Sequence, residues 1–272
     1  MATDITQPRL VAAPEALHDR DGWAIWHSGI VDGPNGLQTT VDVVDTSGKD
    51  RICGPLWEIP DRPRSPIEVT ARADLDEPVH PSASEDLSPA GARLHVRFGR
   101  FDRRLGPRPD NGPVQLTIQV HPVGVRIDRT LGVTLADGDP VTTGLPRPWL
   151  LAAPRLLHNA DGWVLWHSGV VHDLRGLQAT FEILDISGQD RVTGPGWDIP
   201  AFQPGPVDVA ITHAGTQHAA VVAPSSTPRS YRVVTSLPQS VIGTDPLDRT
   251  RLEFSITIVP LNIQVHFVVA GE

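Results

Sequence analysis

The sequence predicts an all-β protein that consists of two tandem homologous units, each a β-sandwich or a β-barrel of roughly six to eight strands. A long internal repeat predicts the two units, and apolar residues that alternate with a period of two predict the strands. The 27 prolines and 24 glycines among 272 residues leave little room for long helices. Alternation alone does not separate a sandwich from a barrel, so both architectures stay open.

The internal repeat aligns Pro8–Pro60 with Pro148–Pro200 without a gap. Of these 53 pairs, 29 are identical, which chance does not produce. The similarity fades after Val69 and Val209 and returns near the end of each copy. A stretch rich in Pro, Gly and Asp before Pro148 is expected to join the two copies. The predicted domains are residues 1–140 and 141–272.

Alternating apolar and polar residues predict half-buried strands at residues 37–43, with their repeat, and at residues 93–98. Residues 23–31 are apolar on both faces, which is typical of a central strand covered from both sides. Helix is expected for one turn at most, at Pro14–Leu17 and its repeat Pro154–Leu157. The strands therefore account for nearly all of the predicted regular structure.

Near the end of each copy the alternation changes phase once, at Pro122 and at Pro260. A β-bulge has this effect, because one extra residue returns the apolar face to the core and bends the strand. A proline is tolerated there because its missing N–H is not needed. The pattern thus predicts one bent strand of about 14 residues at the end of each copy.

Charge and composition narrow the classes of partner. With 23 basic and 32 acidic residues, the formal net charge is −9, so we expect no nucleic-acid partner. No apolar stretch approaches the roughly 18 residues of a membrane span, and the start lacks the features of an export signal. We therefore expect a soluble, cytoplasmic chain with no membrane contact.

Cysteine and metal chemistry are not expected. Cys53 is the one cysteine, and its repeat position holds Thr193, so neither an intrachain disulfide nor a cysteine metal site is available. Histidines and carboxylates are not spaced as metal ligands. The sequence predicts no metal site and no cofactor.

The motif Trp-x-x-Trp-His-Ser-Gly occurs once in each copy, with His27 and His167 at its centre. Adjacent residues of a strand point to opposite faces, so the His and Ser of the motif do not form a nucleophile–base pair. A histidine among apolar neighbours is more often a core residue than a catalyst. If the protein is an enzyme, the candidates are His27 and His167 with Asp21 and Asp161, although Asp-Gly is first of all turn chemistry.

The turn that follows each alternating strand carries Asp45 and Arg51, repeated as Asp185 and Arg191. We expect an Asp–Arg pair to hold this turn in place. Tryptophan supplies the candidate ligand-binding surface, and Trp57 with Trp197 either caps the core or stacks on a sugar or aromatic ligand. The six candidates are Trp23, Trp26, Trp57, Trp163, Trp166 and Trp197.

A run of arginines in the first copy is expected to lack a counterpart in the second. It either forms a partner surface for an anionic group or protects a solvated edge strand from aggregation. The candidate residues are Arg93, Arg97, Arg100 and Arg104.

The leading hypothesis is a non-catalytic tandem β-domain protein for binding or assembly, which self-associates into a homo-oligomer or binds another protein. The alternative is a small-molecule cyclase, isomerase or hydratase that uses an apolar pocket in a β-barrel or between the repeats. A carbohydrate-binding module is the third hypothesis, and it requires exposed Trp57 and Trp197.

Overall fold

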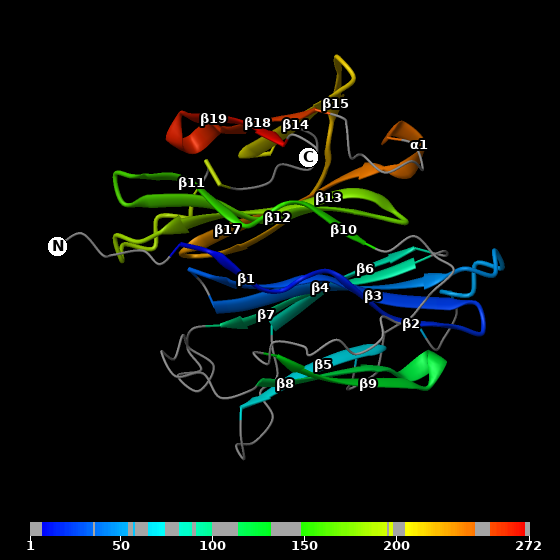
Figure 1. The fold of residues 1–272 in the computed structure, drawn as a ribbon. Helices are drawn as coiled ribbons and strands as arrows, with labels where there is room; N and C mark the ends of the chain where they lie inside the picture. Colours follow the sequence, from blue (N-terminus) through cyan, green and yellow to red (C-terminus); the bar gives the residue numbers. More distant parts are fainter. Residues whose placement is uncertain are drawn as a thin grey trace. The chain divides into compact units, whose positions relative to one another are not determined.

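The computed structural model is built almost entirely of antiparallel strands (Figure 1). It describes residues 7–34, 36–53, 57, 65–73, 82–88, 91–99, 114–131, 148–194, 196–197, 205–242 and 251–269. The chain divides into two compact units, of which one spans Arg9–Pro148 and the other contains Trp149–Glu272. They are called the N-terminal unit and the C-terminal unit below. Within the described ranges, no helix has the length and apolar character needed to cross a membrane.

The N-terminal unit has a six-stranded sheet in the order β1-β3-β4-β7-β6, with β2 also paired to β3, and a three-stranded sheet β5-β8-β9. The strands of the larger sheet are β1 Arg9–Ala12, β2 Glu15–Arg20, β3 Trp23–Gly33, β4 Gly36–Asp45, β6 Ser82–Ser88 and β7 Gly91–Gly99. Those of the smaller sheet are β5 Ile67–Ala73, β8 Val114–Val120 and β9 Val125–Leu131.

The C-terminal unit repeats this order as β10-β12-β13-β17-β16, with β11 paired to β12, and has a four-stranded second sheet β15-β14-β18-β19. The larger sheet contains β10 Trp149–Ala152, β11 Arg155–Ala160, β12 Trp163–Asp173, β13 Gly176–Asp185, β16 Val221–Thr227 and β17 Ser230–Pro238. The smaller sheet contains β14 Val207–His213, β15 Thr216–Ala219, β18 Leu252–Ile258 and β19 Ile263–Val269, and α1 is a single turn at Gln239–Ile242.

Each unit is a β-sandwich, because its core lies between two open sheets and both sheets contribute to it. In the N-terminal unit, Ile25 and Val41 of the larger sheet belong to the same buried cluster as Val69 and Ile118 of the smaller sheet. The C-terminal unit has the same arrangement, with Phe181 and Phe254 from its two sheets. Apolar side chains on the inner face of each sheet therefore determine the architecture.

The segments expected to form one helical turn are strands instead. β2 pairs with β3 from Glu15 opposite His27 to Arg20 opposite Trp23, and β11 pairs with β12 in the same register. Asp21 and Gly22 join β2 to β3 with φ values of 56° and 75°. Two consecutive left-handed residues form the tight hairpin turn that Asp-Gly favours, so the prolines precede a hairpin rather than a helix.

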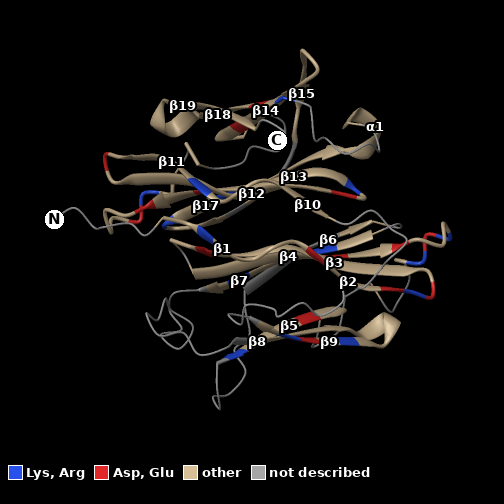
Figure 2. Cartoon of the chain, viewed as in Figure 1, with Lys and Arg blue, Asp and Glu red and all other residues tan. Residues whose placement is uncertain are grey.

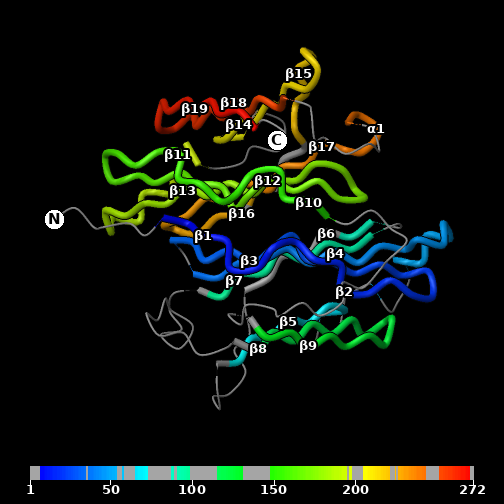
Figure 3. The backbone as a smooth tube through the Cα atoms, viewed as in Figure 1, coloured from blue at the N-terminus to red at the C-terminus, as the bar shows by residue number. Residues whose placement is uncertain are grey.

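The prediction of one bent strand at the end of each copy is wrong as well, because the chain reverses there (Figure 3). The segment His121–Val123 forms a 3₁₀ turn, Gly124 follows with a φ of 70°, and β9 returns antiparallel to β8. In this register Val120 lies opposite Val125 and Ile118 opposite Ile127. Opposite residues of a hairpin share a face, which explains the change of phase without a bulge. The C-terminal unit has an equivalent turn at Val259–Leu261.

The described strands number nine in the N-terminal unit and ten in the C-terminal unit, more than expected from the sequence. The reversal at the 3₁₀ turn and the extra strands β2 and β11 account for much of the difference. β3 is a central strand with both faces buried, as predicted. The division between the units falls at Pro148, eight residues after the expected boundary of 140, which lies outside the described residues.

The polar face of β4 is buried, although alternation predicted that it is solvated. Gln38, Thr40 and Asp42 are 2%, 3% and 0% exposed. Side chains of β7 provide hydrogen-bond partners for two of these residues. Arg93 donates to Asp42 over 2.6 Å, and the His95 ring lies 3.1 Å from the Thr40 hydroxyl. Buried polar groups need such partners, and period-two alternation does not distinguish a paired polar face from a solvated one.

Replacing Gly176 with Ala is expected to destabilise the C-terminal unit by at least about 3 kcal/mol. Gly176 has a φ of 117°, and an added Cβ would lie 2.2 Å from the backbone oxygen of Leu237, which a small movement does not relieve. Urea unfolding of the intact chain measures the loss. Gly188→Ala is the matched control, because Gly188 also has a positive φ but no atom lies within 4 Å of an added Cβ. Equal losses in the two variants would contradict the steric argument.

Candidate functional site

The two motif histidines are packed into the sandwich cores. His27 is 3% exposed and His167 is 1% exposed. Each ring accepts a hydrogen bond at Nδ1 from the backbone N–H two residues later, Gly29 or Gly169, over 3.1 Å. These glycines have φ values of 96° and 110°, and the strand register shifts around them. The motif His-Ser-Gly thus builds a bulge in which the ring supports the irregular backbone.

The surroundings of the two histidines differ between the units. In the N-terminal unit, Glu15 lies 3.9 Å from Nε2 of His27 and accepts a hydrogen bond from Arg129 over 2.9 Å. The neighbouring His27 ring is the largest cause that lowers the pKa of Glu15, and Arg129 adds to it against the effect of burial. These three residues form a chain of polar contacts that joins β2, β3 and β9.

In the C-terminal unit, the His167 ring stacks on Phe267 with centroids 5.0 Å apart. Burial lowers the pKa of His167 to about 4, and the positive charge of Arg155 contributes to this lowering as the second cause. The ring is therefore neutral at pH 7. A buried neutral imidazole with one nitrogen occupied by the backbone fills the core, and this supports the structural interpretation of the motif.

Asp21 and Asp161 do not join the histidines in a catalytic group. Both lie in exposed hairpin turns with positive φ. Asp21 is six residues before His27, which corresponds to roughly 20 Å along an extended strand. These two aspartates are therefore turn residues.

The Asp–Arg pair predicted at the turn after β4 is confirmed. Asp45, whose side chain is fully buried, accepts five hydrogen bonds, two from Ser47 and three from Arg51. Arg51 also donates to the Gly22 oxygen over 2.6 Å, and its guanidinium lies 4.1 Å above the Trp23 ring. We call this arrangement the Asp–Arg clamp. It ties the end of β4 to the β2–β3 turn.

The C-terminal unit contains the same clamp. Asp185 accepts the equivalent bonds from Ser187 and Arg191, and Arg191 lies 4.3 Å above Trp163. Burial raises the pKa of Asp185, but the bonds from Arg191 and Ser187 outweigh burial and hold the pKa well below its usual range. In the N-terminal unit, Arg51 is the largest cause of the same lowering of the Asp45 pKa.

The tryptophan candidates do not form an exposed stacking surface. Trp57 and Trp197 are 3% and 8% exposed and cap the two cores. They lie against Trp23 and Trp163, with ring centroids 6.0 and 5.7 Å apart. Trp26 and Trp166 are also buried. The capping alternative is therefore supported for Trp57 and Trp197, which lack the exposure that a sugar-stacking site requires, while Trp23 is half-buried.

The arginine candidates do not form a solvated edge. Arg93 is 5% exposed, and β7 lies between β4 and β6 rather than at the edge. Arg93 also has a counterpart, because Arg232 lies opposite Glu182 in the C-terminal unit just as Arg93 lies opposite Asp42. Arg97 lies on the same strand, opposite Gln38. Arg100 and Arg104 fall outside the described residues.

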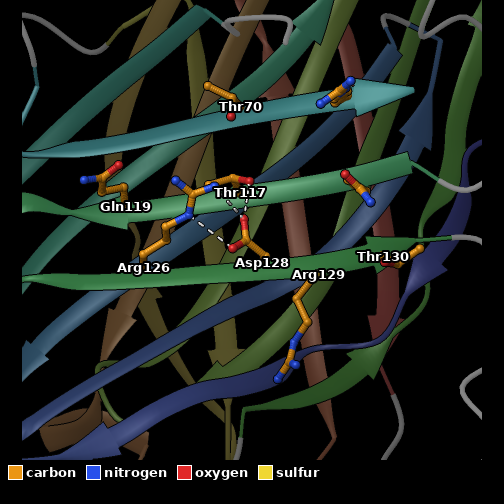
Figure 4. A pocket seen from close by; sticks show the side chains of 9 residues that line it. Thr70, Thr117, Gln119, Arg126, Asp128, Arg129 and Thr130 are labelled. Atoms are coloured by element: carbon orange, nitrogen blue, oxygen red, sulfur yellow. Dashed lines mark hydrogen bonds and ion pairs between the residues drawn. The ribbon is translucent and has the colours of Figure 1, made fainter. Parts of the chain in front are cut away.

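A polar groove on the outer face of the β5-β8-β9 sheet was not predicted from the sequence (Figure 4). Its volume is about 570 Å³, within the range of small-molecule sites. Figure 2 shows acidic and basic positions close together along β5 and β9. Nine residues occupy the outer face of this sheet, and cross-strand neighbours form three rows. The rows are Arg72, Gln115 and Thr130; Thr70, Thr117 and Asp128; and Glu68, Gln119 and Arg126.

The acidic groups of this face have side-chain partners. Arg126 and Thr117 both donate to Asp128, over 3.1 and 2.6 Å, and these bonds lower the pKa of Asp128 in that order of importance. Glu68 lies 3.2 Å from the His121 ring. The sequence signal was available as period-two polar positions in β5, β8 and β9. It was missed because the phase change at Pro122 was interpreted as a bulge in one strand.

The described residues contain no cluster of three or more His, Cys, Asp or Glu side chains placed to hold a metal ion. Cys53 is exposed, and its thiol lies 3.1 Å from the Asp50 oxygen. Thr193 makes the corresponding bond to Asp190 over 3.0 Å. The cysteine thus takes a place in its loop that a threonine takes equally well.

No protein-family model matches the sequence, and no curated protein matches it. Among solved structures, the chain is similar to a conserved domain protein from Bacillus anthracis with a TM-score of 0.29 and 8% identity, over 97% of this chain and 92% of that chain. It is also similar to the N-terminal periplasmic domain of ScsB from Proteus mirabilis, with a TM-score of 0.21 and 11% identity, over 96% of this chain and 100% of that chain. Similarities at these TM-scores assign no function to the chain.

The C-terminal unit is expected to lose stability as the pH falls from about 6.5 to about 4. Because the pKa of His167 is lower in the folded state, the unfolded state takes up a proton in this window and the folded state does not. The full effect is about 3 kcal/mol. Urea unfolding at several pH values measures it, and His167→Gln should remove that part of the slope. NMR titration of the His167 ring with a midpoint near 6.5 would contradict the expectation.

Replacing Asp185 with Asn is expected to cost about 2 kcal/mol at pH 7, because Arg191 loses its charge-assisted bonds. The folded pKa of Asp185 lies below its usual value of 3.8, so this stabilisation is present above pH 4 and is lost as the pH falls through the folded pKa. The difference between wild type and variant in urea unfolding should therefore shrink below pH 4.

Asp190→Asn is the control for this variant, because Asp190 pairs with Arg229 on an exposed surface. Its loss should stay within about 0.5 kcal/mol. A loss in Asp190→Asn as large as that in Asp185→Asn would show that the clamp is no more stabilising than a surface ion pair.

Proposed function

We propose that this chain is a non-catalytic binding protein built from a duplicated β-sandwich, and that the outer-face groove of the N-terminal unit holds its ligand. The groove carries the proposal, since it combines a volume of about 570 Å³ with a lining of hydrogen-bond donors and acceptors. The repeat of the strand order β1-β3-β4-β7-β6 in the C-terminal unit is consistent with duplication of one ancestral unit.

The enzyme alternative receives less support from the described residues. A cyclase, isomerase or hydratase of the kind considered needs an apolar cavity with an acid or base in its wall. His27 and His167 are instead buried in the cores, where the backbone N–H of Gly29 or Gly169 donates a hydrogen bond to one ring nitrogen. The groove is polar and lies on the opposite side of the smaller sheet from the core.

Assembly remains part of the proposal as a second property of the same protein. A chain with two related units can occupy two equivalent positions in a homo-oligomer or bind two partners at once. Light scattering at several protein concentrations measures this property. A defined oligomer would support self-association in addition to ligand binding. A strict monomer would contradict the assembly proposal and leave ligand binding in the groove as the proposed function.

Filling the groove tests the proposal. Thr117 is the central residue of the middle row, so Thr117→Trp is expected to abolish binding of a small polar ligand by the intact chain. Ser255→Trp is the matched control, because Ser255 lies at the corresponding position between Ala210 and His266 in the C-terminal unit. Chemical-shift changes in NMR titrations with neutral sugars, acidic sugars, amino acids and phosphate esters report binding.

Two results would contradict the proposed function. One is that no member of this panel binds in a saturable way, or that Thr117→Trp and Ser255→Trp bind equally well. The other is that the ligand spectrum changes with time in the presence of the protein, which would show turnover.

A further inference from the structure

The strongest unassigned feature of the groove is the row Arg72, Gln115 and Thr130. Arg72 is half-buried, its Nε is shielded from solvent, and this Nε has no hydrogen-bond partner in the part of the chain that the structure describes. A buried donor without an acceptor is unfavourable. An acceptor that enters the groove and bonds to Arg72 would therefore lower the free energy. The Nε of Arg129 has no partner either, but Arg129 already donates to Glu15 through its Nη2.

The other charged groups around the groove do not compensate Arg72. Arg126 is engaged with Asp128, and Arg129 with Glu15 over 2.9 Å. Glu68, the acidic residue on the same face of β5, is four residues away, which corresponds to roughly 13 Å along a strand. Among the described residues, the row of Arg72 contains no acidic side chain, and Arg72 is its one charged member.

The C-terminal unit has the opposite chemistry at the corresponding row. The three positions hold Thr212, Glu253 and Val268. Glu253 pairs with Arg251 over 3.0 Å, and Val268 is an exposed apolar residue. An anion would meet a carboxylate there instead of a guanidinium. An arginine in this row is therefore specific to the N-terminal unit.

We propose that the outer-face groove binds a small polyhydroxylated anion, whose carboxylate or phosphate pairs with Arg72. A guanidinium donates two parallel hydrogen bonds to either group, which fixes both charge and orientation. The hydroxyl and amide groups of Thr70, Thr117 and Gln119 lie along the rest of the groove (Figure 4) and match the hydroxyl groups of such a ligand. This inference rests on the proposed function, since it names the ligand class of the same site.

The test compares three probes of similar size on the intact chain: glucuronate, glucose 6-phosphate and glucose. Isothermal titration calorimetry and NMR titration give the affinities. Glucuronate or glucose 6-phosphate is expected to bind at least roughly tenfold more tightly than glucose, because charge-assisted bonds exceed neutral ones. The two acidic probes distinguish a carboxylate from a phosphate ligand. Raising the salt concentration should weaken the binding of the acidic probes and leave the affinity for glucose unchanged.

In the Arg72→Gln variant, the affinity for the acidic probe should fall to about the affinity for glucose. Arg72→Lys keeps the charge but loses the two parallel bonds, so it should retain part of the preference. Arg251→Gln is the matched control in the C-terminal unit and should bind like the wild type. Thermal unfolding of each variant confirms that the fold is retained, and a folded Arg72→Lys keeps the test valid if Arg72→Gln does not fold.

The outcomes separate the two proposals. If glucose binds as tightly as the acids, or if Arg72→Gln keeps the preference, the anion inference is overturned. The binding function itself still holds in that case, provided that Thr117→Trp abolishes the binding. If none of these probes and no other member of the panel binds the wild type, both the inference and the proposed function are overturned.

Discussion

The Asp–Arg clamp is the interaction on which the rest of each sandwich depends. Asp45 is fully buried and accepts five hydrogen bonds from two residues, so its charge is compensated where water does not reach it. Through Gly22 and Trp23, Arg51 connects this turn to the β2–β3 hairpin and to the tryptophan pair that caps the core. The same connections recur around Asp185, so each unit closes its core at one end with the same set of residues.

This constraint also explains why the most conspicuous sequence motif is structural. The clamp and the capping tryptophans hold β3 and β4 in one register, and the His-Ser-Gly bulge then returns the apolar face to the core at Ile30. His27 and His167 support that bulge from inside the sandwich. The repeated motif thus belongs to the part of each unit that packs the core.

Much of the fold could be predicted from the sequence, because apolar alternation and turn residues are local signals. The all-β class, the core face of β4 and the clamp followed from Val41, Val43, Asp45 and Arg51. The hairpin at Pro122 could not be distinguished from a bulge, since both change the phase of alternation once. The burial of Asp42 and the position of Arg93 depend on which strands are neighbours, and that information is non-local. The groove was missed because the β8–β9 hairpin was interpreted as one strand, and because β5 is distant from that hairpin in sequence.

The distribution of similarity between the copies gives the groove its significance. The residues shared between Pro8–Pro60 and Pro148–Pro200 build β1 to β4, the clamp and the capping tryptophans, which every copy needs in order to fold. The strands β5, β8 and β9 lie entirely outside that range. Arg72 belongs to a row of this sheet whose counterpart in the C-terminal unit contains Glu253. The cores also differ in detail, since Leu116 of one unit corresponds to Phe254 of the other, but both positions stay apolar and buried. The charge on the outer face of the smaller sheet is free to differ, because an exposed position does not have to fit a packed core.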